Sequence, residues 1–151
     1  MTRVTAFAVE HGSVKPAFGY RLDFAGHSIV ISGDTRRSEN VVRAARGVDV
    51  LIHEVTVADP EFLKQSPDAR RVVTELHTSP EDAAAVFSAA RPKLAVFTHV
   101  QVFGSAERRA ELIGSIIPRT LAGYDGRVEL GEDLLTIVVG DTITTTRRLP
   151  H

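Results

Sequence analysis

The sequence predicts a layered α/β domain with a mixed β-sheet and flanking helices. Three observations predict this class. Apolar, β-branched runs typical of strands open and close the chain, and helical and strand patterns alternate between them. The 151 residues suffice for one domain with a buried core, and they contain no internal repeat or clear linker. The apolar fraction of 43% and the charged fraction of 25% are those of an ordinary globular protein.

The N-terminal part is predicted to be a strand followed by a β-hairpin. The first strand is expected at Val4–Val9. The segment Phe18–Phe24 alternates polar and apolar residues, as a half-exposed strand does. A tight turn is expected at Ala25–His27, and the β-branched run Ser28–Ser32 supplies the second strand of the hairpin.

Helices and strands alternate in the middle of the chain. A helix is expected at Glu39–Arg46, where Gly47 ends it, and a buried strand follows at Val48–Ile52. The polar segment Thr56–Leu76 has mixed helical signals, which favour one or two short helices.

A strong helix start follows this segment. Ser79 can cap the helix, Pro80 suits its first position, and the acidic Glu81 and Asp82 favour the positive end of the helix dipole. The helix is expected to end at Arg91–Pro92, where a proline cannot continue it.

The C-terminal part is predicted to contain a strand, a helix and a hairpin. The strand is expected at Leu94–Phe97, and an amphipathic helix at Ser105–Ile117, which Pro118 should end. A hairpin is expected between Leu134–Val139 and Ile143–Thr146.

Composition excludes several classes of site. The chain has no cysteine, which rules out disulfides, thiolate nucleophiles and cysteine-ligated zinc. A metal here would need imidazole and carboxylate ligands, which suit zinc, manganese or iron. The net charge of -1 gives no general attraction to nucleic acid or acidic membranes. The sequence starts without a signal-peptide pattern, and no apolar run approaches a membrane span, so we expect a cytoplasmic protein with no membrane partner.

Polar residues stand where the apolar runs are predicted to end. They are Asp34 in Ser32–Thr35, the pair His53–Glu54, His77 before the capped helix, and His99 after Thr98. In α/β sheets, ligands and catalytic groups gather at the carboxyl ends of strands. We therefore expect these side chains to form part of one site.

Each residue also has a structural interpretation. Asp34 could bridge cations or take a proton, but on residue type alone an aspartate near a helix start more often caps backbone amides. The same tripeptide recurs at Gly140–Thr142 inside the predicted C-terminal hairpin, so only context separates the two. His99 and His77 could bind metal or carry protons, or could be a core-edge and a surface histidine. Of His53 and Glu54, one should point inward and the other away, because side chains alternate along a strand.

Two further features bear on substrate. Arg36 and Arg37 follow Asp34, and arginine beside a metal site favours an anionic substrate, although a solvated helix start explains them as well. No P-loop, G-x-G-x-x-G or G-x-S-x-G motif occurs, so nucleotide binding and serine hydrolysis have no motif support.

Together the motifs resemble a known family. Their order resembles the C-terminal half of the metallo-β-lactamase superfamily, and within it the ribonuclease Z and arylsulfatase-like branch. The resemblance covers roughly residues 4 to 104 and rests on these segments: Glu10–Gly12, Phe18–Arg21, Ser32–Thr35, Leu51–Glu54, His77–Ser79 and Phe97–His99. It implies half of an αββα sandwich, whose two metals, usually zinc, lie between the sheets.

The resemblance also implies roles for single residues. Asp34 would bridge both metals and His99 would be a terminal ligand, while Glu54 and His77 would protonate the leaving group. His11 matches a family motif without a clear role, and we place it with Arg36 as a candidate for substrate binding. In such enzymes a metal-bound hydroxide attacks a phosphate or sulfate ester, so the implied substrate is a small anionic ester or an RNA 3′ end.

One departure from the family limits these expectations. The H-x-H-x-D-H motif that supplies most of the family's metal ligands does not occur in the 151 residues. Asp34 and His99 are two ligands, whereas catalytic zinc usually has three from the protein. We therefore expect one half of such an enzyme, with weak metal binding and poor or no catalysis alone. It would associate with an N-terminal half or with itself through an exposed sheet face.

Two alternatives remain. The chain could be a non-catalytic remnant or a partner-binding domain, whose motif residues have no catalytic role. It could also be a receiver-like domain with Asp34 as phosphoacceptor. That class needs an acidic pair after the first strand, where this chain has His11–Gly12–Ser13.

Overall fold

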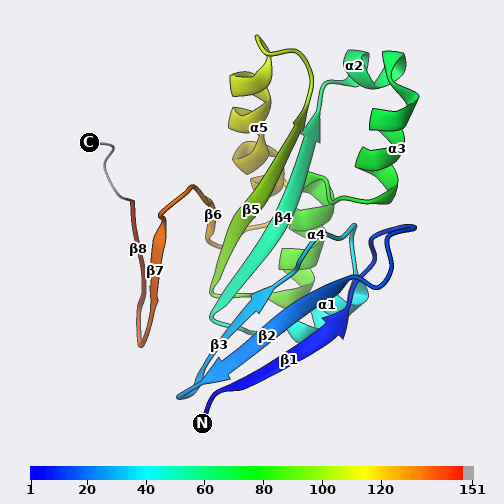
Figure 1. The fold of residues 1–151 in the computed structure, drawn as a ribbon. Helices are drawn as coiled ribbons and strands as arrows, with labels where there is room; N and C mark the ends of the chain where they lie inside the picture. The colour runs from blue at the N-terminus through cyan, green and yellow to red at the C-terminus, as the bar shows by residue number, and fades with distance from the viewer. Residues whose placement is uncertain (148–151) are drawn as a thin grey trace.

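A computed structural model describes residues 1–147 as one mixed β-sheet with helices on one face and a hairpin on the other (Figure 1). The sheet has the order β1-β2-β3-β4-β5-β6, and β7 and β8 form the separate hairpin. The strands are β1 (Arg3–Ala8), β2 (Phe18–Phe24), β3 (His27–Ile31), β4 (Val50–Ala58), β5 (Leu94–Phe103), β6 (Val128–Leu130), β7 (Thr136–Val139) and β8 (Ile143–Thr146). The helices are α1 (Glu39–Ala44), α2 (Pro60–Gln65), α3 (Pro67–Glu75), α4 (Pro80–Ala90) and α5 (Arg109–Leu121).

Strand pairing follows from the connections. The first three strands pair antiparallel: the loop 9–17 joins β1 to β2, and a tight turn at 25–26 joins β2 to β3. Strands β3 to β6 pair parallel, since longer connections containing helices separate them. This pairing confirms the layered α/β class and the mixed sheet. Within residues 1–147, no helix is long and apolar enough to cross a membrane.

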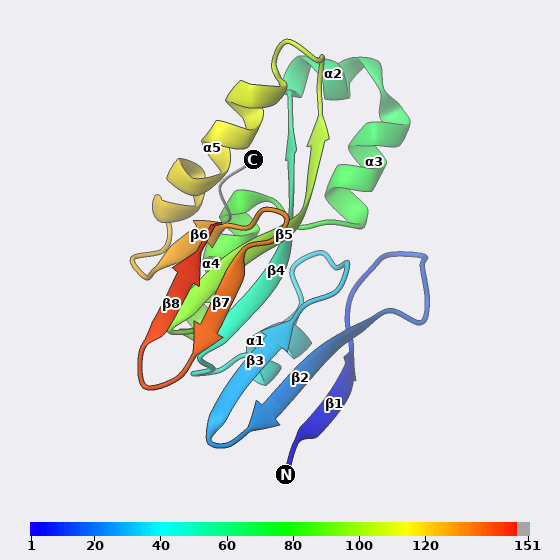
Figure 2. The same cartoon turned by 60° about the vertical axis from the view of Figure 1, so that its left-hand side comes forward.

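The two faces of the sheet are covered unequally. Buried side chains of α1, α4 and α5 pack with those of β4 and β5 in the main core. On the other face, the β7–β8 hairpin covers Val50, Leu94 and Val96 in a smaller cluster. Figure 2 shows the hairpin over the β4–β6 side and the β1–β3 side without cover. Large apolar side chains remain exposed on this uncovered part: Val4, Phe18, Tyr20, Phe24 and Ile31.

The two central strands, β4 and β5, extend beyond their neighbours as a two-stranded ribbon (Figure 1). Glu54 pairs with Thr98 and Val55 pairs with Val100, so His99 is an extra residue in β5, a β-bulge. Its φ is 45°, which is in the left-handed region.

The predicted strand ends at Ile52 and Phe97 are therefore wrong. The polar residues that follow them lie inside β4 and β5, not at strand ends. The pairing continues because the apolar residues beyond them alternate again and reach the core, as Val55 and Val100 do.

The helix predictions succeeded where the signal was local. The side chain of Ser79 accepts a hydrogen bond from the Asp82 N–H, Pro80 is the first residue of α4, and Arg91 ends it. Two short helices, α2 and α3, occupy most of the predicted polar segment.

The prediction for α5 was wrong at both ends. The helix begins at Arg109 and continues past Pro118 to Leu121. A proline removes one intrahelical hydrogen bond, and here it falls in the last turn, where buried Ile116 and Thr120 hold the helix against the rest of the fold. The three-residue strand β6 was missed because so short a segment carries no periodic signal.

Candidate active site

The fold brings the predicted site residues together at one place. Asp34 lies in the loop after β3, Glu54 in the middle of β4, His77 in the loop before α4, and His99 at the bulge of β5. The neighbouring strands β4 and β5 and the two loops beside them position the four side chains. The site is therefore built from segments that are distant in sequence.

The turn at Gly33 positions Asp34. Gly33 has a φ of 63°, and a Cβ atom there would lie 2.3 Å from the Phe18 carbonyl oxygen. Only glycine fits this close backbone approach. The Asp34 side chain is 46% exposed, and its Oδ2 lies 3.6 Å from His99 Nε2.

Glu54 is buried and collects three hydrogen-bond donors on one oxygen. Its Oε1 accepts from the backbone N–H groups of Thr35 and Thr78, both at 3.1 Å, and from His77 Nδ1 at 3.2 Å. Burial raises the pKa of the Glu54 carboxyl above its usual value, while the hydrogen bond from His77 opposes that rise. The carboxylate thus ties the loop after β3 to the loop before α4.

This contact fixes which nitrogen of His77 carries the proton. Because Glu54 Oε1 already accepts two backbone N–H groups, His77 Nδ1 must donate to it. In the neutral ring, Nε2 then has a free lone pair that can accept a proton or a hydrogen bond. The ring is buried, and Nε2 is directed toward β5, where it meets Gln101.

Gln101 is a site residue that the sequence did not indicate. Its side-chain Nε2 lies 3.1 Å from His77 Nε2 and 2.8 Å from His99 Nε2. An amide within an apolar strand carries no distinguishing pattern. The bulge places Gln101 beside the histidines, and a bulge arises from the pairing of two strands. It therefore cannot be predicted from the type of a single residue.

His11 supports the site from its edge. Its Nδ1 lies 2.9 Å from the Leu76 carbonyl oxygen, and its ring meets that of His77 edge-on with 5.1 Å between centroids. His11 therefore holds the loop that carries His77. The candidate role of His11 in substrate binding stays a prediction.

His53 lies outside the site, in the main core. As the alternation of strand side chains predicts, it points to the opposite face from Glu54, and its ring packs edge-on against Phe87. Its Nδ1 is 2.7 Å from the Glu54 carbonyl oxygen. Complete burial lowers the pKa of His53 to about 4, so the ring is neutral at physiological pH.

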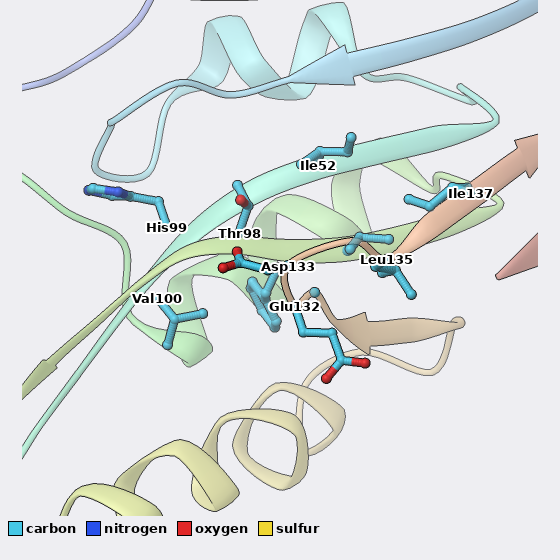
Figure 3. A pocket seen from close by; sticks show the side chains of 11 residues that line it. Ile52, Thr98, His99, Val100, Glu132, Asp133, Leu135 and Ile137 are labelled. Atoms are coloured by element: carbon cyan, nitrogen blue, oxygen red, sulfur yellow. The ribbon is translucent and has the colours of Figure 1, made fainter. Parts of the chain in front are cut away.

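Two hollows adjoin the site. One, of about 440 Å³, lies between the sheet and the loop before β7, with His99 and Asp133 among its lining residues. In Figure 3, His99 and Thr98 lie toward one end of this hollow and Ile137 toward the other. The second, of about 660 Å³, is lined by His77 together with Arg36 and Arg37. The positive charge of Arg37 is partly neutralised by Glu39, whose carboxylate lies 3.9 Å from the Arg37 guanidinium.

The donor set does not make a complete metal site. The separation between Asp34 Oδ2 and His99 Nε2 is one that two ligands of a single ion can have, but a catalytic zinc needs a third protein ligand. Among residues 1–147, no three histidine, aspartate or glutamate side chains are grouped to hold an ion. His99 Nε2 is also in contact with Gln101. These residues can contribute two ligands and cannot hold a catalytic metal alone.

Comparisons with known proteins match the sequence and the fold of this chain to one superfamily. The family model for the beta-lactamase superfamily domain matches residues 1–100. The chain is 31% identical over 134 residues to a ribonuclease Z of Mycobacterium tuberculosis, covering 86% of this chain and 46% of the relative. The chain spans about half the length of the curated relatives it matches.

Solved structures share the fold. The metallo-beta-lactamase fold protein YhfI from Bacillus subtilis aligns with 96% of this chain and 50% of its own, with a TM-score of 0.67 and 14% identity. The short form of human tRNase Z aligns with 86% of this chain and 40% of its own, with a TM-score of 0.53 and 24% identity. At these identities the likeness concerns the fold.

Proposed function

This chain belongs to the metallo-β-lactamase superfamily, and we propose that it carries the proton-transfer pair and two metal ligands of a phosphodiester hydrolase acting on RNA. The observation that carries the proposal is the buried contact of 3.2 Å between Glu54 and His77. The similarity to ribonuclease Z supports RNA as the substrate class.

The proposed chemistry of this pair follows from its hydrogen bonds. Glu54 holds His77 Nδ1–H, so a proton can enter and leave the ring only at Nε2, which is directed into the site. A protonated His77 would be stabilised by the carboxylate and would donate its Nε2 proton to the leaving oxygen of the ester. Such general acid–base catalysis contributes about 10²- to 10⁴-fold in rate.

Substrate binding is assigned to the hollow beside His77. Arg36 lines it, and a guanidinium matches the paired oxygens of a phosphate diester. The chain's net charge of -1 gives no general attraction to RNA, so binding would depend on this local cation.

The remaining metal ligands are proposed to come from outside the 151 residues. Asp34 and His99 would meet a histidine cluster of the H-x-H-x-D-H kind on a further polypeptide segment. Bound metal, with zinc, manganese or iron as candidates, would activate the attacking water. Alone, the chain is expected to bind metal weakly and catalyse poorly or not at all.

Reconstitution tests this proposal. The chain would be mixed with a polypeptide carrying the H-x-H-x-D-H motif and with Zn²⁺ or Mn²⁺. Hydrolysis of bis(p-nitrophenyl) phosphate and of an RNA with a 3′ extension would then be measured. We expect activity only in the mixture, with a loss of about 10² or more in His77→Gln and Glu54→Gln.

The histidine at position 27 offers a matched control, because it lies outside the site at the start of β3. His27→Gln should keep the activity of the mixture. The proposal fails if the mixture shows no metal-dependent hydrolysis, or if His77→Gln is as active as His27→Gln.

A non-catalytic, partner-binding domain is the second candidate. The incomplete ligand set and the uncovered apolar sheet face favour it. It predicts no metal uptake in the mixture, and no change in partner binding when Asp34 or His99 is replaced by alanine. Metal uptake that depends on either residue would exclude it.

A further inference from the structure

We propose that Thr78 is a positioning residue, whose buried hydroxyl sets the spacing between the proton carrier His77 and the cation Arg36. The proposal deepens the proposed function and rests on the roles that it gives to these two residues. Thr78 and its partner Thr35 are fully buried, and neither lines the hollow that His77 and Arg36 line. Any effect of Thr78 on the reaction is therefore exerted through its neighbours.

The first observation is a hydrogen bond between two loops. Thr78 Oγ1 lies 2.6 Å from the carbonyl oxygen of Thr35. A carbonyl oxygen can only accept, so the hydroxyl donates its single hydrogen to it. Both residues are 0% exposed, and burial strengthens the bond because water does not compete for it. The bond joins the loop before α4 to the loop after β3.

The second observation is that each polar group of Thr78 has a partner. Its N–H donates to Glu54 Oε1 at 3.1 Å, and its hydroxyl donates to Thr35. Its carbonyl oxygen accepts the Thr56 N–H at 2.8 Å. Glu54 and Thr56 both belong to β4, so Thr78 is fixed to the central strand as well as to the other loop.

The third observation is what stands next to each end of the bond. His77 directly precedes Thr78, and Arg36 directly follows Thr35. The Thr35 end is fixed in turn, since its hydroxyl oxygen accepts the Glu10 N–H at 3.1 Å and the Arg36 N–H donates to the Glu10 carbonyl at 2.8 Å. The bond therefore holds the backbone beside the proton carrier at a set distance from the backbone beside the cation.

The Thr78 hydroxyl is the part of this contact that depends on residue type. Glu54 also bridges the loops, but it does so through backbone N–H groups that every residue except proline has. Serine could replace the hydroxyl of Thr78, whereas valine has the same shape without the donor. Loss of the donor removes a partner from the buried Thr35 carbonyl, which favours separation of the two loops.

The positioning is tested on the chain alone by NMR. In the unchanged chain, we expect the imidazole ¹⁵N signals of His77 to report a proton fixed at Nδ1, because this nitrogen faces Glu54. Thr78→Val and Thr78→Ala should move these signals toward the average of the two tautomers. The Thr35 amide should exchange with solvent roughly 2- to 10-fold faster in both variants. Thr78→Ser keeps the hydroxyl and should restore both readouts.

The matched control is Thr120→Val. It removes an equally buried hydroxyl, which donates to the Ile116 carbonyl at 2.9 Å within α5. This variant should change neither readout, because the bond lies outside the site. The proposal is overturned if folded Thr78→Val and Thr78→Ala keep the signals of the unchanged chain, or if Thr120→Val changes them equally.

Hydrolysis in the reconstituted mixture gives a second measurement. Thr78→Val should lower kcat about 10- to 100-fold and change KM less, because the spacing of the two side chains matters most in the transition state. Thr78→Ser should keep most of the activity, and equal activity of the two variants contradicts the proposal. If the mixture shows no hydrolysis at all, the proposed function fails, while the NMR measurements still decide whether the Thr78 hydroxyl positions His77.

Discussion

Two buried histidines that contact the same glutamate, Glu54, differ in the group that each one meets. His77 lies on the loop side of Glu54 and is held by its carboxylate, whereas His53 lies in the core and meets only the Glu54 carbonyl and an aromatic ring. A carboxylate partner can stabilise a charged imidazole, and a carbonyl in an apolar core cannot do so to the same extent. The environment thus suits His77 to proton transfer and His53 to packing.

This difference predicts an acid sensitivity that belongs to His53. Its pKa is about 4 in the fold and about 6.5 when unfolded, so the unfolded chain binds more protons between these values. The free energy of unfolding should therefore fall by about 3 kcal/mol as the pH drops from 6.5 to 4. In His53→Leu that contribution disappears, which urea denaturation at several pH values measures.

The raised pKa of Glu54 acts with the opposite sign, since its protonated form is favoured in the fold. This contribution is common to the unchanged chain and to His53→Leu, so the difference between the two isolates His53. His27→Leu controls for loss of a histidine that is partly exposed and lies beside Asp49. A pH profile of His53→Leu parallel to that of the unchanged chain would refute the assignment.

At the scale of elements, local signals were predictable and tertiary pairing was not. Four consecutive residues, Ser79 to Asp82, mark the start of α4, and each of them interacts with the helix end in which it lies. The start could therefore be predicted from these residues alone. The bulge at His99 leaves no such mark, because a register shift is a relation between two strands. The sequence therefore indicated His99 and Glu54 as site candidates but placed them at strand ends and missed Gln101.

The bulge itself makes a prediction about stability. His99 adopts a φ of 45°, a conformation that costs a residue with a Cβ about 1 kcal/mol relative to glycine. Since both replacements remove the imidazole, His99→Gly should be more stable than His99→Ala by about 1 kcal/mol in urea denaturation.

A second pair of variants, at Val102 in regular strand, checks whether the left-handed conformation of His99 is the cause. Glycine in regular strand weakens it, so Val102→Gly should be less stable than Val102→Ala. If His99→Gly is instead the weaker member of its pair, the left-handed conformation at the bulge is not a feature of the protein in solution.

At the scale of the whole molecule, the two faces of the sheet are covered to different extents. Helices α1, α4 and α5 bury the central part of one face, while the hairpin on the other face stops short of β1–β3 and leaves contiguous apolar side chains exposed there (Figure 2). Contiguous exposed apolar patches mark surfaces that bind another protein or associate. The small net charge of -1 does little to keep two copies apart.

We therefore predict that the chain associates through this face. Tyr20 and Phe24 are 44% and 60% exposed on it, and Tyr20→Lys with Phe24→Lys should shift the sedimentation coefficient toward that of a monomer. Leu121 is 49% exposed on α5, on the helical side, so Leu121→Lys adds one of the two lysine charges to a similarly exposed apolar position elsewhere. It should leave association unchanged, because the effect belongs to one face. A stable monomer at all concentrations, before any substitution, would contradict the prediction.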